Sequence, residues 1–258
     1  MREIWALGGA VVNGWVAIPH TFSAETMAHQ GWDSLTVDMQ HGVSDYQAAL
    51  GALTAISTTA TVPMVRVPWL EPGILMKMLD AGAYGVICPM VNTPAEAELF
   101  VRATTYPPRG ERSYGPIRAL LYGGADYPQH ADKTIVRFAM IETKAALDNL
   151  KEILKVDGLD AVYIGPADLS NALGCTPKFD QDEKPVVEAI DYIVRETLAA
   201  GKVAGIHNGT PAYAKKMIAK GFRFVTIGSD ARLMAAAAKA VVTEMKGGET
   251  KGAGGGTY

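Results

Sequence analysis

The chain has 258 residues, of which 48% are hydrophobic and 20% are charged, and this balance is that of a globular protein. It excludes an intrinsically disordered, collagen-like or disulfide-scaffold protein. Lysine and arginine total 24 and aspartate and glutamate total 27, so the formal net charge of −3 gives no field that would attract nucleic acid or an anionic membrane, and neither is expected as a partner.

Eight short apolar segments recur along the chain, each followed by a loop and a segment of helical periodicity. The apolar segments are nearly continuous, as expected for strands that helices cover on both faces. The predicted strands span residues 15–18, 34–39, 63–67, 85–90, 136–141, 161–165, 203–206 and 222–227. The predicted helices span residues 24–30, 45–57, 72–81, 94–104, 144–154, 183–200, 211–220 and 230–245.

Eight such units in one chain of this length predict an α/β protein, a single-domain (β/α)8 TIM barrel over residues 1–245. A doubly wound open sheet is the alternative, but the glycine-rich phosphate loop expected after its first strand is missing. Residues 106–133 are expected to be a functional loop, in which Arg118, Tyr122 and His130 could contribute to substrate selectivity. Residues 246–258 are glycine-rich and are expected to form a flexible C-terminal tail.

The cysteine content and the apolar runs indicate the compartment. Cys88 and Cys175 are the only cysteines, too few for a disulfide framework or a thiolate zinc site. One bridge between them is conceivable, but two free thiols in a reducing compartment are expected. The beginning of the chain lacks a signal-peptide pattern, and no run approaches 18 uninterrupted apolar residues. We therefore expect a soluble, cytoplasmic protein.

In a barrel of this kind, the active site lies where the carboxyl ends of the strands meet. Glu142 and Asp168 follow adjacent predicted strands at corresponding heights, and a divalent cation would relieve the repulsion between them. Two carboxylates without cysteine or a histidine cluster favour Mg²⁺ or Mn²⁺, with Co²⁺ as a further candidate, over a closed zinc site. The alternative is an ion pair between one of the acids and Arg66.

Three further residues at the predicted strand ends are typical of acid–base and carbonyl chemistry. His41 could act as a general base that Asp38, three residues earlier, orients. In the alternative interpretation, His41 caps the next helix and Asp38 makes a structural hydrogen bond. Arg66 can offer two fixed donors to a carboxylate or an enolate oxygen, or it can form a structural salt bridge. Residues 165–170 place backbone N–H groups at a helical turn, where a carboxylate or phosphate could bind.

These strand-end residues resemble the HpcH/HpaI aldolase family of metal-dependent pyruvate aldolases. The resemblance extends from residue 15 to about residue 242. Its clearest motifs are residues 37–41 (VDMQH), 64–66 (MVR), 79–85 (LDAGAYG), 89–93 (PMVNT), 106–110 (YPPRG), 112–116 (RSYGP), 141–143 (IET) and 163–170 (YIGPADLS). Any one of these motifs alone would be unspecific, but their combination in this order is highly specific.

The resemblance implies a divalent-metal-dependent aldolase that reversibly cleaves 4-hydroxy-2-oxo acids to pyruvate, or a related 2-oxo acid, and an aldehyde. It also implies a homo-oligomer, usually a hexamer built as a dimer of trimers with exchanged C-terminal helices. The implied metal ligands are Glu142 and Asp168. The implied catalytic residues are His41, Arg66 and Asp38. The implied substrate-binding residues are Arg66, Gly165, Ala167, Asp168, Trp15 and His207.

Two residues depart from the pattern of the family and can alter the pocket. Met140 stands where some members have Gln, and His207 stands where an apolar residue is common.

Three other functions stay open. A Schiff-base aldolase would need a lysine in the barrel mouth, for which Lys144 is the nearest candidate. An acyl-CoA lyase of the citrate-lyase type would share the barrel and the metal. A non-catalytic barrel that binds a small acid would need no proton shuttle.

Overall fold

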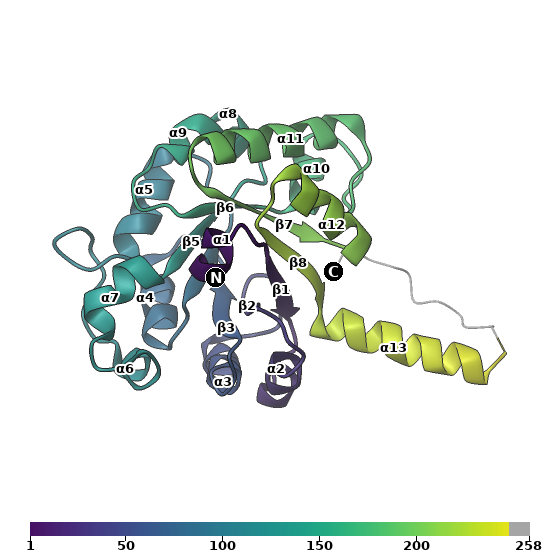
Figure 1. The fold of residues 1–258 in the computed structure, drawn as a ribbon, viewed down its shortest axis with the longest axis horizontal. Coiled ribbons are helices and arrows are strands. Elements are labelled where there is room, and N and C mark those ends of the chain that lie inside the picture. Colours follow the sequence, from purple (N-terminus) through teal and green to yellow (C-terminus); the bar gives the residue numbers. More distant parts are fainter. Residues whose placement is uncertain (248–258) are drawn as a thin grey trace.

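The structure, a computed structural model, describes residues 1–247 of the chain. Within them, eight parallel strands pair in chain order, and β8 also pairs with β1, so the sheet closes into a barrel (Figure 1). The predicted (β/α)8 barrel is confirmed. The strands are β1 (Val11–Val16), β2 (Ser34–Asp38), β3 (Val62–Arg66), β4 (Gly85–Cys88), β5 (Val136–Met140), β6 (Ala161–Ile164), β7 (Val203–Asn208) and β8 (Phe224–Ser229).

Helices surround the barrel, because a connection between parallel strands must cross from one end of the sheet to the other. None of the helices in the described part of the chain is long and apolar enough to cross a membrane. The helices are α1 (Arg2–Ala6), α2 (Thr21–Ala28), α3 (Tyr46–Ile56), α4 (Pro72–Asp80), α5 (Pro94–Ala103), α6 (Ile117–Gly123), α7 (Tyr127–Thr134), α8 (Lys144–Asp148), α9 (Leu150–Leu154), α10 (Pro166–Ala172), α11 (Lys184–Ala199), α12 (Pro211–Lys220) and α13 (Asp230–Met245).

Local signals in the sequence determine where several helices begin. At the start of α5, the Thr93 hydroxyl accepts a hydrogen bond from the Glu96 N–H, and the Glu96 carboxylate accepts one from the Thr93 N–H. This reciprocal pair satisfies N–H groups that have no acceptor within the helix. Pro94 occupies the first turn, where its missing N–H costs nothing. The boundary predicted at residue 94 is therefore correct.

The first strand begins four residues and ends two residues earlier than predicted, over Val11–Val16 instead of residues 15–18. The polar residue Asn13 interrupts its apolar pattern, yet Asn13 is fully buried inside the barrel. Its side chain donates to the Thr226 hydroxyl (3.0 Å) and accepts from the Ser34 hydroxyl (2.8 Å). The partners come from strands far away in the sequence, so the local pattern could not reveal this strand.

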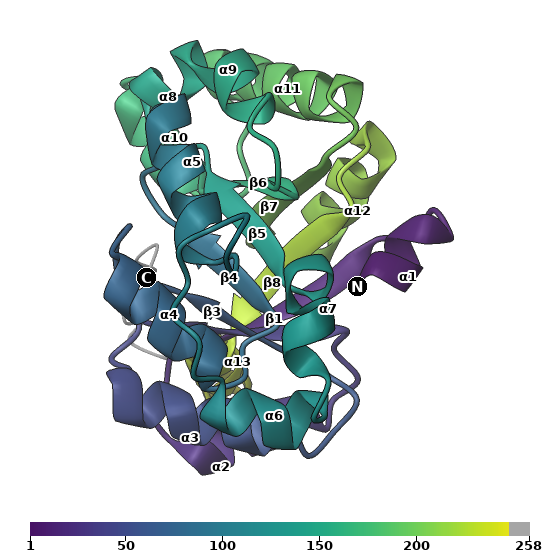
Figure 2. The same ribbon diagram turned by 90° about the vertical axis from the view of Figure 1, so that its left-hand side faces the viewer.

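Residues 106–133 were predicted to be an irregular loop, and this prediction is wrong, because α6 and most of α7 lie within them. In Figure 2 these two helices follow each other on the outside of the barrel, and α6 packs beside α4. The fully buried Arg112 anchors the segment, since its guanidinium bonds Asp80 (2.7 Å) and the Tyr127 hydroxyl (3.1 Å). Tertiary contacts of this kind stabilise two helices that their own sequences do not predict.

Two smaller predictions also need correction. Residues 144–154 form two short helices, α8 and α9, which are separated at Asn149. The side chain of Asn149 donates to the Asn92 carbonyl oxygen of the neighbouring loop (2.8 Å), and this contact accompanies the break. Residues 166–172 form the additional helix α10. The predicted C-terminal tail, residues 246–258, lies outside the described residues from residue 248 onward.

The last helix, α13, does not lie against the barrel as the other helices do. Figure 1 shows it projecting away from the strands. Among its residues only Asp230, at its start, is buried. The remainder of α13 exposes apolar side chains that would be covered if the helix packed on another surface. These exposed side chains are Leu233, Met234, Val241, Val242 and Met245.

Candidate active site

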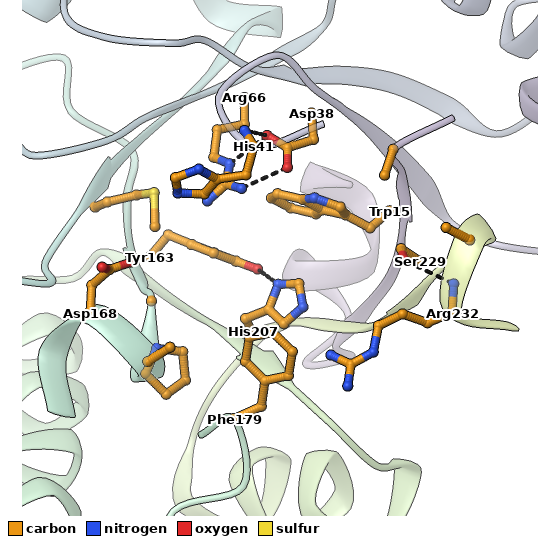
Figure 3. Close-up of a pocket in the computed structure, with 16 residues that line it drawn as sticks. Trp15, Asp38, His41, Arg66, Tyr163, Asp168, Phe179, His207, Ser229 and Arg232 are labelled. Atoms are coloured by element: carbon orange, nitrogen blue, oxygen red, sulfur yellow. Dashed lines mark hydrogen bonds and ion pairs between the residues drawn. The ribbon is translucent and has the colours of Figure 1, made fainter. Parts of the chain in front are cut away.

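A cavity opens at the carboxyl ends of the strands, where the sequence predicted the site (Figure 3). Side chains from β1, β2, β3, β5, β6, β7 and β8, or from the loops after them, converge on it, because closure of the barrel brings these strand ends together. Eight of the predicted site residues line it. They are Trp15, Asp38, His41, Arg66, Gly165, Ala167, Asp168 and His207.

The ninth predicted residue, Glu142, does not line the cavity, but a Cβ atom at the cavity residue Gly165 would lie 2.6 Å from Glu142 Oε2. The sequence did not single out several other residues that line the cavity. Tyr163 was hidden in an apolar strand, Phe179 lies in the loop after α10, and Arg232 lies in the first turn of α13. Only the position of Tyr163, near the end of a strand, could have indicated it.

Asp38 and Arg66 form a buried ion pair at the ends of two neighbouring strands. They are partners in the register of β2 and β3, which places their side chains next to each other. Arg66 Nε donates to Asp38 Oδ1 (2.8 Å) and Arg66 Nη2 donates to Asp38 Oδ2 (2.7 Å), so the contact is bidentate. Burial alone would raise the pKa of the Asp38 carboxyl, but the guanidinium outweighs this effect and holds the pKa below its ordinary value. Asp38 is therefore ionised and fixes the position of Arg66.

His41 lies in the turn after β2, and its side chain reaches the rim of the cavity. Its backbone N–H donates to Asp38 Oδ1 (3.3 Å), so Asp38 helps to shape the turn that presents the imidazole. Burial and the nearby charge of Arg66 lower the pKa of His41 below 6.5, against the opposing effects of Asp38 and Asp168. His41 is thus neutral at pH 7, as a general base must be.

The alternative role of His41, as the cap of the next helix, is excluded. The N-cap of α3 is Asp45, whose carboxylate accepts a hydrogen bond from the Ala48 N–H (2.9 Å). The three residues between His41 and this cap leave the imidazole on the cavity side of the turn, where Figure 3 shows it beside Arg66.

Glu142 follows β5 and is only 2% exposed. Burial raises the pKa of its carboxyl to about 7, and the charge of Asp168 adds to this effect. Its Oε1 accepts a hydrogen bond from the Met90 N–H (2.9 Å). Met90 has a φ of 56°, which makes it the only residue other than glycine in the left-handed region within residues 1–247. Strained backbone of this kind persists where the surrounding structure holds it in place, and it aims this N–H at the carboxylate.

The other oxygen of Glu142 faces the loop after β6, and a glycine makes this approach possible. A Cβ atom at Gly165 would lie 2.6 Å from Glu142 Oε2. Three residues later, Asp168 lies in the first turn of α10 and lines the cavity. The charge of Asp168 raises the pKa of the Glu142 carboxyl, so the two acids predicted to bind a metal lie close enough to interact, and a side chain at position 165 would crowd Glu142.

The donor set at this position fits a hard divalent cation. A buried carboxyl with a raised pKa and a second acid nearby favour a bound positive charge. No group of three or more His, Cys, Asp or Glu side chains that could hold a metal occurs in residues 1–247. Two protein carboxylates leave coordination positions for water and substrate oxygens, as is typical of Mg²⁺ and Mn²⁺. Arg66, the alternative partner of the acids, gives two of its donors to Asp38.

A Schiff-base mechanism finds no suitable lysine in the described part of the chain. Lys144 lies at the start of α8, its side chain is 62% exposed, and it pairs with Asp148 one helical turn away. No lysine of residues 1–247 lines the cavity. The residues Arg118, Tyr122 and His130, which were predicted to influence substrate selectivity, do not line it either. Arg118 instead donates to the Ala81 carbonyl oxygen after α4 (2.6 Å).

The chain belongs to the HpcH/HpaI aldolase/citrate lyase family, whose model matches residues 13–237. It is 43% identical over 246 residues to a hydroxypyruvate/pyruvate aldolase of Rhizorhabdus wittichii, covering 95% of this chain and 98% of that protein. It is 37% identical over 253 residues to a 4-hydroxy-2-oxo-heptane-1,7-dioate aldolase of Salmonella typhi, covering 97% and 95%. Fold and family together place the chain among the carbon–carbon lyases.

A solved structure shows the same fold. The crystal structure of a HpcH/HpaI aldolase/citrate lyase family protein from Burkholderia cenocepacia superposes with a TM-score of 0.86 at 30% sequence identity. The match covers 92% of this chain and 95% of that chain. The barrel and its helices are therefore shared over nearly the entire length.

The buried ion pair predicts the effect of a single substitution on stability. Asp38→Asn should lower the free energy of unfolding by about 3 kcal/mol, because it leaves the buried guanidinium of Arg66 without its counter-charge. The measurement is urea denaturation followed by tryptophan fluorescence. Because the pKa of Asp38 is lowered in the folded protein, the pair stabilises fully above the ordinary pKa of 3.8, and this contribution is lost as the pH falls through the lower folded value.

The control for this substitution is Asp182→Asn, since Asp182 makes an ion pair with Lys178 while its side chain is 79% exposed. Water screens this surface pair, so the variant should unfold like the wild type. Equal stabilities of Asp38→Asn and the wild type at pH 7 would show that the buried pair does not stabilise the fold.

Proposed function

We propose that the protein is a divalent-metal-dependent aldolase that cleaves 4-hydroxy-2-oxo acids to pyruvate, or a related 2-oxo acid, and an aldehyde, and that also catalyses the reverse addition. The observation that carries the proposal is the close approach of Glu142 to Gly165, which lines the cavity together with Asp168, Arg66 and His41. Two relatives, a hydroxypyruvate/pyruvate aldolase and a 4-hydroxy-2-oxo-heptane-1,7-dioate aldolase, are named for this reaction type, which supports the proposal.

Glu142 and Asp168 are the residues that would hold the metal, with Mg²⁺, Mn²⁺ or Co²⁺ as the candidates. When bound, such an ion supplies a Lewis acid for the keto group of the substrate. The backbone N–H groups of Ala167 and Asp168 lie in the first turn of α10, where they have no acceptor within the helix. These N–H groups would bind the carboxylate of the 2-oxo acid beside the metal position.

Arg66 would bind the keto oxygen and stabilise the negative charge that develops on it. Its guanidinium is already fixed by two hydrogen bonds to Asp38 and lies 4.8 Å above the Trp15 ring. Because the donor is fixed before the substrate arrives, no reorganisation is needed when the charge develops. Asp38 thus acts on the reaction by positioning Arg66 and the turn of His41.

His41 would accept the proton of the C4 hydroxyl group of the substrate. In cleavage, a base removes the proton of the C4 hydroxyl group, the C3–C4 bond breaks, and its electron pair passes to the 2-oxo acid fragment as the enolate. The aldehyde forms from C4, and a proton then adds at C3. In the addition reaction these steps run in reverse, and His41 returns the proton to the new hydroxyl group. The lowered pKa of His41 keeps it in the basic form that begins cleavage at pH 7.

Exchange of the C3 protons of pyruvate with D₂O tests the reaction without knowledge of the aldehyde. We expect exchange in the presence of Mg²⁺ or Mn²⁺ and its loss with a chelator. Arg66→Ala should slow the exchange by about 100-fold or more, because the developing charge loses its fixed donor. Proton NMR of pyruvate over time gives the rates, after removal of Mn²⁺ where that ion is used.

The matched control is Arg195→Ala, since Arg195 is an exposed residue of α11 outside the cavity. This variant should catalyse the exchange of the pyruvate protons at the wild-type rate. Full activity of Arg66→Ala would contradict the role of Arg66. If the wild type exchanges neither pyruvate nor another 2-oxo acid with either metal, the aldolase proposal fails, and a non-catalytic barrel that binds a small acid is favoured.

Metal binding can be tested separately from turnover. Gly165→Ala places a Cβ atom in the space beside Glu142 Oε2, so we expect Mn²⁺ affinity to fall at least about tenfold while the protein still folds. Isothermal titration with Mn²⁺ gives the affinity, and thermal unfolding reports on the fold. Gly115→Ala is the control, because nothing lies within 4 Å of a Cβ atom there. Wild-type affinity in Gly165→Ala would place the metal elsewhere.

We also propose a homo-oligomer in which α13 packs on a neighbouring copy, as in the hexamer with exchanged C-terminal helices that the family resemblance implies. The exposed apolar side chains of α13 support this arrangement. The first turn of the same helix lines the cavity through Ala231 and Arg232, so the assembly would extend from the active site.

The compartment proposed is the reducing cytoplasm, since neither Cys88 nor Cys175 forms a disulfide.

The substitution Val241→Glu tests the role of α13. It puts a charge among the apolar side chains that would be covered, so it should dissociate the oligomer or shift it to a smaller form. Sedimentation velocity measures the size. Leu7→Glu makes the same chemical change at an exposed residue after α1 and should leave the size unchanged. A monomeric wild type, or an intact oligomer of Val241→Glu, would contradict the proposal.

A further inference from the structure

A hydrogen-bonded pair of polar side chains, distinct from the two acids proposed to hold the metal, lies in the wall of the cavity. The Tyr163 hydroxyl and His207 Nδ1 are 3.0 Å apart. Tyr163 lies opposite Gly205 in the pairing of β6 and β7, and a Cβ atom at Gly205 would be 2.9 Å from its ring. Because side chains two apart on a strand share a face, His207 emerges beside the hydroxyl end of this ring.

Aromatic neighbours hold the pair in place, as Figure 3 shows. The Trp15 ring stacks on Tyr163 at 6.2 Å and meets the His207 ring edge-on at 5.1 Å. The Phe179 ring lies 4.5 Å from His207. Contacts of this type fix ring orientation, so the imidazole presents a defined edge to the cavity.

The pair is polar but uncharged. Burial and the charge of Arg66 lower the pKa of His207 to about 3, so the imidazole is neutral at physiological pH. Nδ1 is engaged by Tyr163, which leaves Nε2 as the ring nitrogen for a ligand in the cavity that His207 lines. A neutral imidazole offers a single donor or acceptor there, and a hydroxyl group can match either one, since it both donates and accepts. A methyl group would leave Nε2 without a partner.

The location of the pair indicates which part of a substrate it would meet. The Trp15 indole contacts the Arg66 guanidinium (4.8 Å) and also His207. A 2-oxo acid with its keto oxygen at Arg66 would therefore lie along Trp15, with the carbon next to the keto group directed toward His207. This placement rests on the proposed function, in which Arg66 binds the keto oxygen.

We propose that the Tyr163–His207 pair binds a hydroxyl group on the carbon next to the keto group of the donor substrate. The protein would then prefer 3-hydroxy-2-oxo acids, such as hydroxypyruvate, to 2-oxo acids with a methyl group at that carbon. A site that must hydrogen-bond a substrate hydroxyl discriminates against the analogue that lacks it, because its own polar group is left unpaired. The neutral pair also gives no advantage to a donor with a second carboxylate at this carbon.

The experiment compares proton exchange at C3 of hydroxypyruvate and of pyruvate in D₂O with Mg²⁺. The measured quantity is the ratio of the two kcat/KM values. We expect the wild type to favour hydroxypyruvate by about tenfold or more. His207→Leu should bring the ratio close to one, because hydroxypyruvate exchange should fall by more than pyruvate exchange. Tyr163→Phe keeps the stacked ring and should reduce the ratio in the same direction.

Tyr192→Phe is the matched control, because it removes a phenol hydroxyl from α11 outside the cavity and should leave the ratio unchanged. An unchanged ratio in both His207→Leu and Tyr163→Phe, or a wild type that does not prefer hydroxypyruvate, would overturn the proposal. If His207→Leu does not fold, Tyr163→Phe decides alone.

A binding measurement separates this proposal from the proposed function. Titration of each 2-oxo acid, followed by tryptophan fluorescence, gives its affinity without any reaction. If the wild type exchanges neither donor, the aldolase proposal fails. A larger loss of affinity for hydroxypyruvate than for pyruvate in His207→Leu would still support the hydroxyl site. Equal losses of affinity for hydroxypyruvate and pyruvate would overturn the proposal of a hydroxyl site.

Discussion

Closure of eight parallel strands into a barrel brings all their carboxyl ends to one rim, and every polar group of the site depends on this geometry. Asp38 and Arg66 become neighbours because β2 and β3 pair in a register that aligns their last residues. Tyr163 and His207 meet because β6 and β7 are adjacent. A shift of one residue in either register would turn one partner to the opposite face of the sheet, so the sheet determines which charges and donors meet.

The charged side chains at this rim differ in whether a neighbouring opposite charge compensates them, and this difference favours a bound cation beside the acids. Arg66 is neutralised by Asp38 through a bidentate pair, whereas Glu142 receives a hydrogen bond only from the neutral Met90 N–H among the contacts described. Asp168 adds a second negative charge near Glu142, and this raises the pKa of Glu142 further. A dication at this position would compensate both acids. The proposed metal and the fixed guanidinium of Arg66 would then both stabilise negative charge on the same substrate.

The start of α13 connects the site to the proposed assembly. Asp230, the buried first residue of this helix, accepts hydrogen bonds from the backbone N–H groups of Ala17 (2.8 Å) and Ile18 (3.2 Å) and from the Ser23 hydroxyl (2.7 Å). The loop after β1 and the first turn of α13 are therefore tied together at the rim. A helix that leaves the barrel to pack on another copy would still be anchored beside the cavity, next to Arg232.

Signals from residues that are close together in the sequence were sufficient to predict most strands, several helix starts and two site candidates. Nearly continuous apolar runs revealed seven strands close to their true positions, and residues such as Pro94 marked helix starts, because these signals depend on neighbours along the chain. Charged residues just after apolar runs identified Glu142 and Asp168 as site candidates, since burial of an unpaired charge is costly wherever the chain places it.

The pairing of distant groups was decided only by the tertiary structure. Asn13 is polar yet fully buried, because β8 and β2 supply its partners, and α6 and α7 pack around the buried Arg112. The same holds for the close approach of Glu142 to the side-chain-free Gly165 and for the hydrogen bond between Tyr163 and His207. The amino-acid sequence by itself determined which residues need a partner, whereas the closure and register of the barrel decided which partner each one has, because those contacts join residues that are far apart in the chain.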